Sequence, residues 1–126
     1  MPQWLSETWV EETNRSIDLA TPFTGLVQVT VTGVAGGDVR FHRVYQGGQV
    51  ISGGPGLAKN PDIGLTLPEA DAREVLEGRL DPSVAFMQGR LKTAGDNGLL
   101  LGLLSGWSSP AGAASLAQLR TSADNG

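Results

Sequence analysis

The sequence contains no cysteine and a single histidine, His42. These absences exclude disulfide bonds, thiolate chemistry and metal sites built from cysteine or from several histidines of one chain. The 9 basic residues are scattered and are outnumbered by 13 acidic ones, which gives a formal net charge of −4. Because no basic stripe is present to follow a phosphate backbone, the composition argues against nucleic acid as a partner.

The sequence also lacks a long hydrophobic run. Its beginning has no basic stretch followed by a long apolar segment, and its end is not a Ser-Lys-Leu peroxisomal address. The apolar run L-L-L-G-L-L at residues 99–104 is far shorter than the roughly 20 residues that a bilayer requires. We therefore expect no transmembrane segment and a cytoplasmic protein.

Signatures of catalysis are missing as well. His42 falls on the polar side of an expected strand, where a solvated surface imidazole is the simplest interpretation. The Gly-rich stretch before Lys59 lacks the spacing of a phosphate-binding loop. Four acids recur at helical spacing and predict a solvated acidic face: Glu69, Asp71, Glu74 and Glu77. We expect a protein that is not an enzyme and uses no cofactor.

The length of the chain predicts a single domain over residues 1–126, with residues 121–126 as a frayed tail. Ser6 is expected to cap a first helix that runs to about residue 15. The next segments predict an antiparallel meander, followed by one further strand and a helix. The expected strands span residues 26–33, 39–46, 49–52 and 63–67, and the helix spans residues 68–78.

The segment 81–104 organises the rest of the chain. Asp81-Pro82 begins a short helix that Gly89 ends, and residues 90–94 form a brief strand. Asp96 then caps a Leu-rich helix, and Ser109-Pro110 starts the last one. Because residues 99–104 carry no polar face, that helix must be covered on every side by protein, membrane, partner or ligand.

The string D-P-S-V-A-F-M-Q-G-R-L-K-T-A-G-D, followed by this Leu-rich helix, resembles the signature region of the sterol carrier protein type-two family. The resemblance runs from about residue 63 to residue 104. It implies an α+β fold with a five-stranded, mostly antiparallel sheet, in the strand order 3-2-1-4-5. It also implies helices packed on one face of the sheet, enclosing an apolar tunnel that takes lipids.

The resemblance and the strand phases together indicate the residues that line such a tunnel. Gln88 matches a Gln of the family motif, and it either caps a helix end or meets a ligand headgroup. The Leu-rich helix with Gly102, or the last helix with Trp107 at its hinge, is the expected gate. The expected ligand-binding residues are Val29, Val31, Phe41, Leu65, Phe86, Gln88, Leu91, Leu99, Leu100, Leu103, Leu104, Trp107 and Leu116.

The function implied is non-catalytic binding of a hydrophobic small molecule: a sterol-like lipid, a fatty acid or a fatty acyl-CoA. Whether the protein also transfers this molecule stays open. Two alternatives stay open. One is an interaction module that forms a homodimer or docks on a partner enzyme. The other is a small enzyme that acts on a pocket-bound ligand through His42 or Arg43. From the residues alone, an ordinary close-packed core is an alternative to a cavity.

Arg43 interrupts the apolar face of its strand, which it shares with Phe41 and Tyr45. Two interpretations follow. The side chain lies at the sheet edge with its stem on apolar surface and its head in water, or it reaches into the cavity and meets a ligand's polar end.

Overall fold

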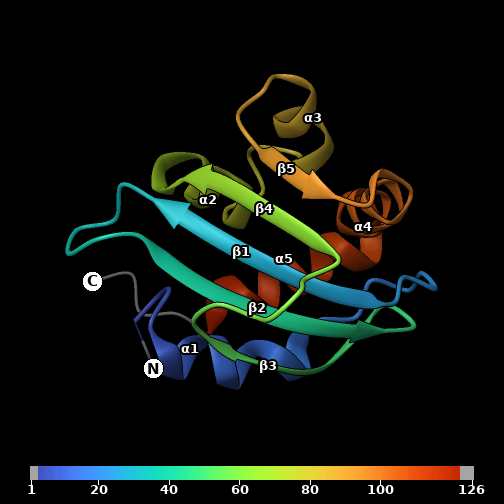
Figure 1. Cartoon of the computed structure of the whole chain (residues 1–126), viewed down its shortest axis with the longest axis horizontal. Coiled ribbons are helices and arrows are strands. Elements are labelled where there is room, and N and C mark those ends of the chain that lie inside the picture. Colours follow the sequence, from blue (N-terminus) through green and yellow to red (C-terminus); the bar gives the residue numbers. More distant parts are fainter. Residues whose placement is uncertain (1–2, 123–126) are drawn as a thin grey trace.

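The computed structural model describes residues 3–122 of the chain. Its strands and helices follow the sequence-based boundaries closely (Figure 1). The helices are α1 (Glu7–Thr13), the 3₁₀ turn η1 (Asn14–Ser16), α2 (Glu69–Leu76), α3 (Pro82–Met87), α4 (Asn97–Ser108) and α5 (Pro110–Thr121). The strands are β1 (Gly25–Thr32), β2 (Val39–Gln46), β3 (Gln49–Pro55), β4 (Ile63–Pro68) and β5 (Lys92–Gly95).

The strands form one 5-stranded sheet in the order β3-β2-β1-β4-β5, which confirms the expected order. Strands β1, β2 and β3 pair antiparallel as a meander, and β4 pairs antiparallel with β5. Strand β4 runs parallel to β1. The turn between β2 and β3 places Gly47 and Gly48 at φ values of 59° and 83°, the left-handed region that glycine adopts without strain. The sheet is therefore mixed, but mostly antiparallel.

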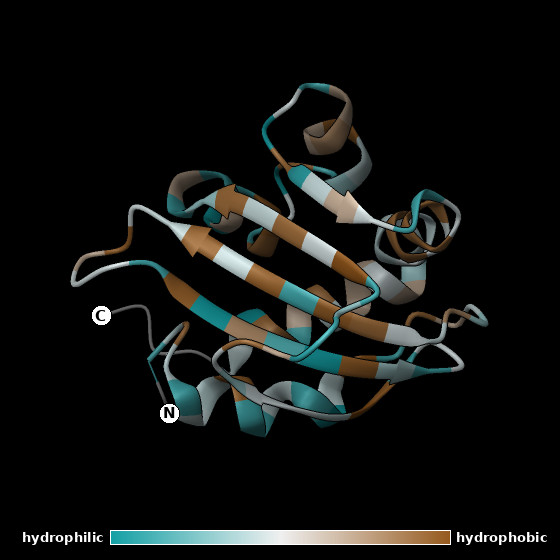
Figure 2. Ribbon diagram, viewed as in Figure 1, coloured by the Kyte–Doolittle hydropathy of each residue, from teal (hydrophilic) through white to brown (hydrophobic). Residues whose placement is uncertain are grey.

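The helices cover one face of this sheet, because β1, β2 and β4 turn their apolar residues to the same side. Val27 and Val31 on β1 are each 2% exposed, and Figure 2 shows the alternation of apolar and polar residues along β1 and β4. The loop from β3 to β4 crosses the opposite face, where Gln28 anchors it (Figure 1). Gln28 Nε2 donates to the carbonyl of Gly56 over 3.2 Å, and its Oε1 accepts from Ala58 N over 2.6 Å.

The helix starts are capped as the sequence predicts. Ser6 Oγ accepts from the amide of Trp9, and Ser109 Oγ accepts from that of Gly112. A carboxylate oxygen of Asp81 caps α3 in the same way, and one of Asp96 caps α4. These side chains satisfy amide groups that have no partner within a helix, so the four helices begin at defined residues.

Two boundaries differ from the expectation. Strand β5 begins at Lys92 rather than at residue 90, because the amides of Arg90 and Leu91 both bond to the carbonyl of Ala85 and extend the end of α3. Strand β3 continues to Pro55, past the expected end at residue 52. The expected frayed tail, residues 121–126, lies mainly outside the described residues, and Thr121 is the last residue of α5.

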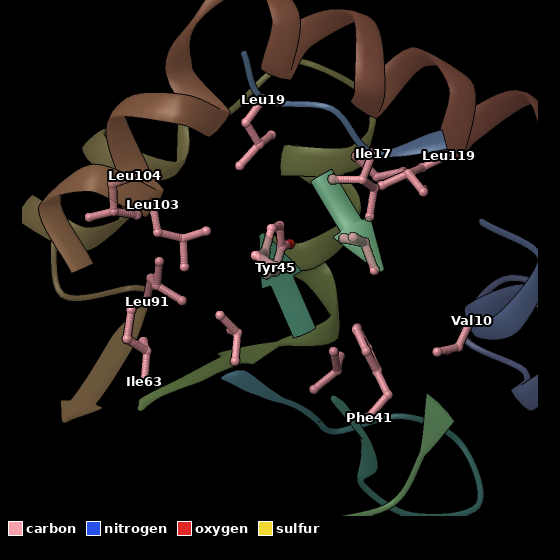
Figure 3. Close-up of a cluster of buried hydrophobic side chains, with 14 of the residues drawn as sticks. Val10, Ile17, Leu19, Phe41, Tyr45, Ile63, Leu91, Leu103, Leu104 and Leu119 are labelled. Carbon is pink, nitrogen blue, oxygen red and sulfur yellow. The ribbon is translucent and has the colours of Figure 1, made fainter. Parts of the chain in front are cut away.

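The apolar core lies between the sheet and the helices (Figure 3). Leu19, Ile63, Ala85 and Leu103 are 0% exposed. The chain itself does not cover α4 on every side, because the side chain of Leu101 is 64% exposed. Cover of Leu101 by a membrane, a partner or a ligand stays a prediction. Of the helices within residues 3–122, none combines the length and the apolar character that a bilayer crossing needs.

Candidate functional site

A cavity of about 160 Å³ lies between the sheet and the helices. Strands β1, β2 and β4 form its floor, and each of the α-helices α1 to α5 contributes at least one side chain to its walls. Its lining is apolar apart from Arg43 and the polar ends of a few aromatic rings. The residues that line it are Trp9, Val27, Val29, Phe41, Arg43, Tyr45, Leu65, Leu67, Val75, Pro82, Ala85, Leu91, Leu103, Leu104, Trp107, Leu116 and Leu119.

Most of the residues expected from the sequence to bind ligand lie at this wall. Figure 3 shows how they converge: Leu103 and Leu104 of α4 and Leu91 lie on one side of Tyr45, and Phe41 lies on the floor. The structure thus brings together residues from three strands, from helices α4 and α5 and from the segment just before β5. The expected residues found at the wall are Val29, Phe41, Leu65, Leu91, Leu103, Leu104, Trp107 and Leu116.

Five expected residues lie elsewhere. Val31 and Leu100 are buried in the core, 2% and 3% exposed, without lining the cavity. Leu99 is partly buried against that core. Phe86 lines a surface hollow between α3 and α4 instead. Gln88 is exposed at the end of α3, where its Oε1 accepts a hydrogen bond from Arg90 Nη1 over 3.1 Å.

The cavity also takes residues that the sequence-based set omits. Val27 lies two positions from Val29 on β1, and Leu67 lies two positions from Leu65 on β4. Because residues two apart on a strand share a face, the alternation of the strand is the sequence signal that could have identified both. Ala85 and Pro82 carried no such signal, since only the docking of α3 over the sheet brings them to the cavity. The other omitted wall residues are Trp9, Arg43, Tyr45, Val75 and Leu119.

Arg43 is the charged residue of the cavity wall. The interpretation that places the head of this residue in water is wrong, because its side chain is 4% exposed and lies at the cavity. The contact with a ligand's polar end stays a prediction. Its Nη2 donates to Thr13 Oγ1 over 3.0 Å, and its guanidinium carbon lies 5.8 Å from the ring centroid of Trp9 and 5.2 Å from that of Phe41. Helix α1 therefore covers the guanidinium, and two aromatic rings flank it.

Burial is the largest cause of the pKa shifts of Arg43 and Tyr45, the two ionisable side chains at this end of the cavity. It lowers the pKa of Arg43, and the nearby Tyr45 side chain opposes that shift. Burial likewise raises the pKa of Tyr45, against the effect of the positive charge of Arg43. Tyr45 therefore stays a neutral hydroxyl at physiological pH. His42, the neighbouring titratable residue on β2, lies on the opposite face, with Nδ1 3.2 Å from the carbonyl oxygen of Gly56.

A second hollow, of about 280 Å³, adjoins the cavity on the outside. Pro82, Trp107 and Leu116 line both spaces and so form the partition between them. Beside this partition, Asp81 Oδ1 accepts hydrogen bonds from the amide of Ser83 over 2.7 Å and from Ser108 Oγ over 2.8 Å. The bond from Ser108 is the largest cause that lowers the pKa of Asp81. The start of α3 is thereby tied to the end of α4.

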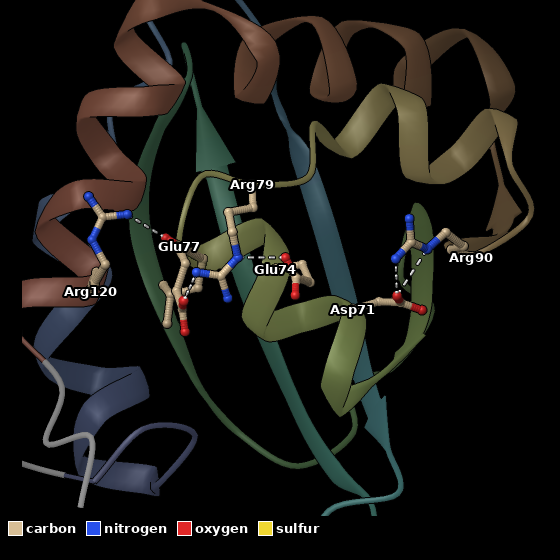
Figure 4. A network of polar contacts seen from close by, with 7 residues as sticks. Asp71, Glu74, Glu77, Arg79, Arg90 and Arg120 are labelled. Carbon is tan, nitrogen blue, oxygen red and sulfur yellow. Dashed lines mark hydrogen bonds and ion pairs between the residues drawn. The ribbon is translucent and has the colours of Figure 1, made fainter.

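The acids of α2 are engaged in ion pairs rather than simply solvated (Figure 4). Arg79 bridges Glu74, at 2.8 Å, and Glu77. Arg90 Nη2 lies 2.9 Å from Asp71 Oδ1, which connects the end of α3 to α2. From α5, Arg120 Nη1 donates to the carbonyl of Leu76 over 2.8 Å. These contacts lie at the surface and hold the helices that form the cavity wall; none of them points into the cavity.

Comparison with known proteins gives a family and several related structures. The model of the SCP-2 sterol transfer family matches residues 7–104. A conserved hypothetical protein from Thermus thermophilus, described as possibly a sterol carrier protein, superposes with a TM-score of 0.75 at 20% identity, over 99% of this chain and 93% of that chain. A sterol carrier protein 2 crystal structure gives 0.71 at 22% identity, over 92% and 96% of the two chains.

A palmitated sterol carrier protein 2-like protein from Aedes aegypti gives a TM-score of 0.55 at 22% identity, over 66% of this chain and 71% of that chain. No curated protein sequence matches the chain. The structural likenesses establish the fold. The family model extends the resemblance seen at residues 63–104 back to residue 7, and so matches most of the chain. The chain therefore belongs to the SCP-2 sterol transfer family.

Proposed function

We propose that this protein binds a hydrophobic small molecule in the cavity, without catalysis, and carries it between sites. The single observation that supports this most is the apolar lining that all five α-helices and three strands build together. Ligand pockets are mostly apolar with a few placed polar groups, and this cavity has that character. Membership of the SCP-2 sterol transfer family supports the same function.

The binding energy comes from burial of apolar surface. Each CH₂ group removed from water contributes about 0.8 kcal/mol, so a long hydrocarbon needs few polar contacts to be held. The cavity, at about 160 Å³, is close to the roughly 150 Å³ of an engineered cavity that binds benzene. A sterol or a long acyl chain is larger than benzene, so its binding requires the helices to move outwards.

The partition of Pro82, Trp107 and Leu116 is our candidate for the gate. It separates the cavity from the outer hollow, and Trp107 lies in the last turn of α4, just before the corner with α5. Swinging this corner outwards joins the two spaces and exposes the cavity. This corner is one of the two gates expected from the sequence; the other is the Leu-rich helix with Gly102.

The composition of the wall supports binding over catalysis. Among residues 3–122, no Asp or Glu lines the cavity, and His42 lies on the opposite face of the sheet. General acid–base chemistry on a cavity-bound molecule most often uses one of these groups within hydrogen-bond reach. The ligand classes that we propose are a sterol-like lipid, a fatty acid or a fatty acyl-CoA. The relative from Aedes aegypti is described as palmitated.

The proposal is tested by titrating the purified chain with hexadecanoic acid, cholesterol and hexadecanoyl-CoA while recording Trp fluorescence, since Trp9 and Trp107 both line the cavity. We expect saturable binding of at least one of them. Ala85→Leu, which adds a side chain into the cavity, should weaken that binding. Leu101→Ser is the matched control, because Leu101 is 64% exposed and lies outside the wall.

Absence of binding by all three probes would refute the proposal. So would a folded Ala85→Leu variant that binds as tightly as the unaltered chain, because the ligand would then lie somewhere other than in this cavity. Circular dichroism of the variant establishes that it is folded before the comparison is made.

A further inference from the structure

Arg43 places a positive charge in an apolar cavity, and no negative charge among the described residues balances it. Within residues 3–122, the ion pairs are made by Arg40, Arg73, Arg79 and Arg90, and none is made by Arg43. Burying a charge without a counter-charge is strongly unfavourable, and natural proteins pair such groups. Among the described residues, the groups that face this cation are neutral: the hydroxyl of Thr13 and the rings of Trp9 and Phe41.

The neutral groups around Arg43 do not remove this imbalance. Thr13 Oγ1 accepts one N–H, while Arg43 Nε is buried with no hydrogen-bond partner within residues 3–122. Asn14 Oδ1 is the other buried side-chain atom of that range without a partner. It lies nearby: a Cβ on Gly53 would meet Arg43 Cγ at 3.0 Å and Asn14 Oδ1 at 3.1 Å. An amide oxygen can accept a hydrogen bond from the guanidinium, but it cannot neutralise the charge.

We infer that the cavity is built for a ligand with a carboxylate head, which pairs with the guanidinium of Arg43 beneath helix α1. This inference rests on the proposed function and names its ligand class: a long-chain carboxylic acid, rather than a sterol or an ester. The planar fork of a guanidinium matches a carboxylate in two parallel hydrogen bonds. Attraction between the two charges is strongest in a cavity from which water is excluded.

The position of Arg43 also sets the direction of the ligand. Arg43 lies on β2, and the apolar wall continues from it over β1 and β4 to Leu91, just before β5. Three strand spacings separate β2 from β5, or about 14 Å at the usual 4.7–4.9 Å between strands. The hydrocarbon tail therefore runs across the sheet, under Leu103 and Leu104 of α4, with its methyl end towards α3.

Matched probes test the head-group assignment. The affinities of hexadecanoic acid, hexadecan-1-ol and methyl hexadecanoate are measured by calorimetry on the unaltered chain and on Arg43→Met. The unaltered chain should prefer the acid over both neutral probes by roughly tenfold or more. Arg43→Met should lower the affinity for the acid by roughly 10- to 100-fold and leave the affinity for the alcohol unchanged. Arg40→Met is the control, because Arg40 on the same strand is exposed and pairs with Asp38.

The outcomes separate the two proposals. If the neutral probes bind as tightly as the acid, or if Arg43→Met leaves their ratio unchanged, the Arg43 inference is wrong while the proposed function stands. If none of the probes binds, both are wrong. Should Arg43→Met not fold, the preference of the unaltered chain for acid over alcohol still decides the inference.

Paramagnetic NMR tests the direction independently. Hexadecanoic acid that carries a nitroxide near its carboxylate should broaden the indole N–H signal of Trp9 much more strongly than one that carries it near the methyl end, because paramagnetic broadening falls steeply with distance. Trp9 is the suitable reporter because its ring lies 5.8 Å from the guanidinium carbon of Arg43. Broadening of Trp9 by the methyl-end label alone would overturn the orientation and with it the pairing with Arg43.

Discussion

Thr13 and Arg43 join helix α1 to strand β2 through one buried hydrogen bond, from Arg43 Nη2 to Thr13 Oγ1 at 3.0 Å. The Thr13 hydroxyl in turn donates to the carbonyl of Trp9 over 2.6 Å. Its lone pairs therefore face the guanidinium, and its orientation is set by the helix backbone. This contact holds the charged end of the side chain at the cavity, between the rings of Trp9 and Phe41.

We predict that Thr13→Val lowers the free energy of unfolding by about 1–3 kcal/mol, because it leaves a buried N–H of Arg43 without an acceptor. Arg43→Met should leave the stability of the ligand-free chain unchanged or raise it, since replacing a buried charge by an apolar side chain is often neutral or stabilising. Urea unfolding of both variants and of the double variant measures the coupling. In the Arg43→Met background, most of the loss from Thr13→Val should disappear; an undiminished loss would contradict the account.

Two glycines of helix α4 should respond in opposite ways to alanine. A Cβ on Gly102 meets only Phe23 Cδ1, at 3.9 Å, so Gly102→Ala should raise the free energy of unfolding by up to about 1 kcal/mol. A Cβ on Gly106 would lie 2.8 Å from Thr21 Cγ2 and 3.0 Å from Leu19 Cβ, so Gly106→Ala should lower it by about 1–3 kcal/mol. Thermal denaturation compares the pair. Equal effects of the two changes would show that α4 does not approach the segment 19–21 as described.

The Leu-rich part of α4 should be less protected from hydrogen exchange than the central strand β1. It covers a cavity instead of a filled core, it contains Gly102, and Leu101 is 64% exposed. Exchange of the amides of residues 99–104 is measured by NMR with and without bound hexadecanoic acid. Protection should rise on binding. Protection equal to that of β1 in the free chain would exclude a loosely held wall.

The link between α3 and α4 should depend on the charge of Asp81. Its pKa in the folded chain is lowered from the ordinary 3.8, first by the hydrogen bond from Ser108. The ionised carboxylate therefore stabilises the fold above about pH 3.8, and this contribution is lost as the pH falls through the lowered pKa. Asp81→Asn should melt at a lower temperature than the unaltered chain near neutral pH, and the difference should vanish in acid. A difference that stays constant with pH would contradict this role.

Much of the fold follows from local patterns in the sequence. Four helices begin where a side-chain oxygen accepts a hydrogen bond from a backbone amide of the first helical turn. The residues that supply these oxygens are Ser6, Asp81, Asp96 and Ser109. The alternation of apolar residues in β1, β2 and β4 defines the inner face, because a strand repeats every two residues. These local signals suffice to place most of the elements at their observed boundaries.

The limits of the cavity could not be predicted from the same patterns. Strand phase assigns Val31 correctly to the inner face, but the length of the cavity along β1 depends on where the helices dock, and they leave Val31 in the core. Arg43 shows the same limit: its phase places it on the inner face, while its charge favours water. Helix α1 decides between the two, because Thr13 and Trp9 cover the guanidinium.

The most direct test of the account is native mass spectrometry of the protein purified from its own host, followed by extraction and identification of any bound molecule. The account predicts one hydrophobic molecule per chain, and the extracted species should carry a carboxylate. A neutral lipid in the same ratio would support ligand binding in the cavity, but it would contradict the pairing of Arg43 with a carboxylate. A ligand-free mass that takes up no fatty acid, acyl thioester or sterol on titration would contradict the central claim.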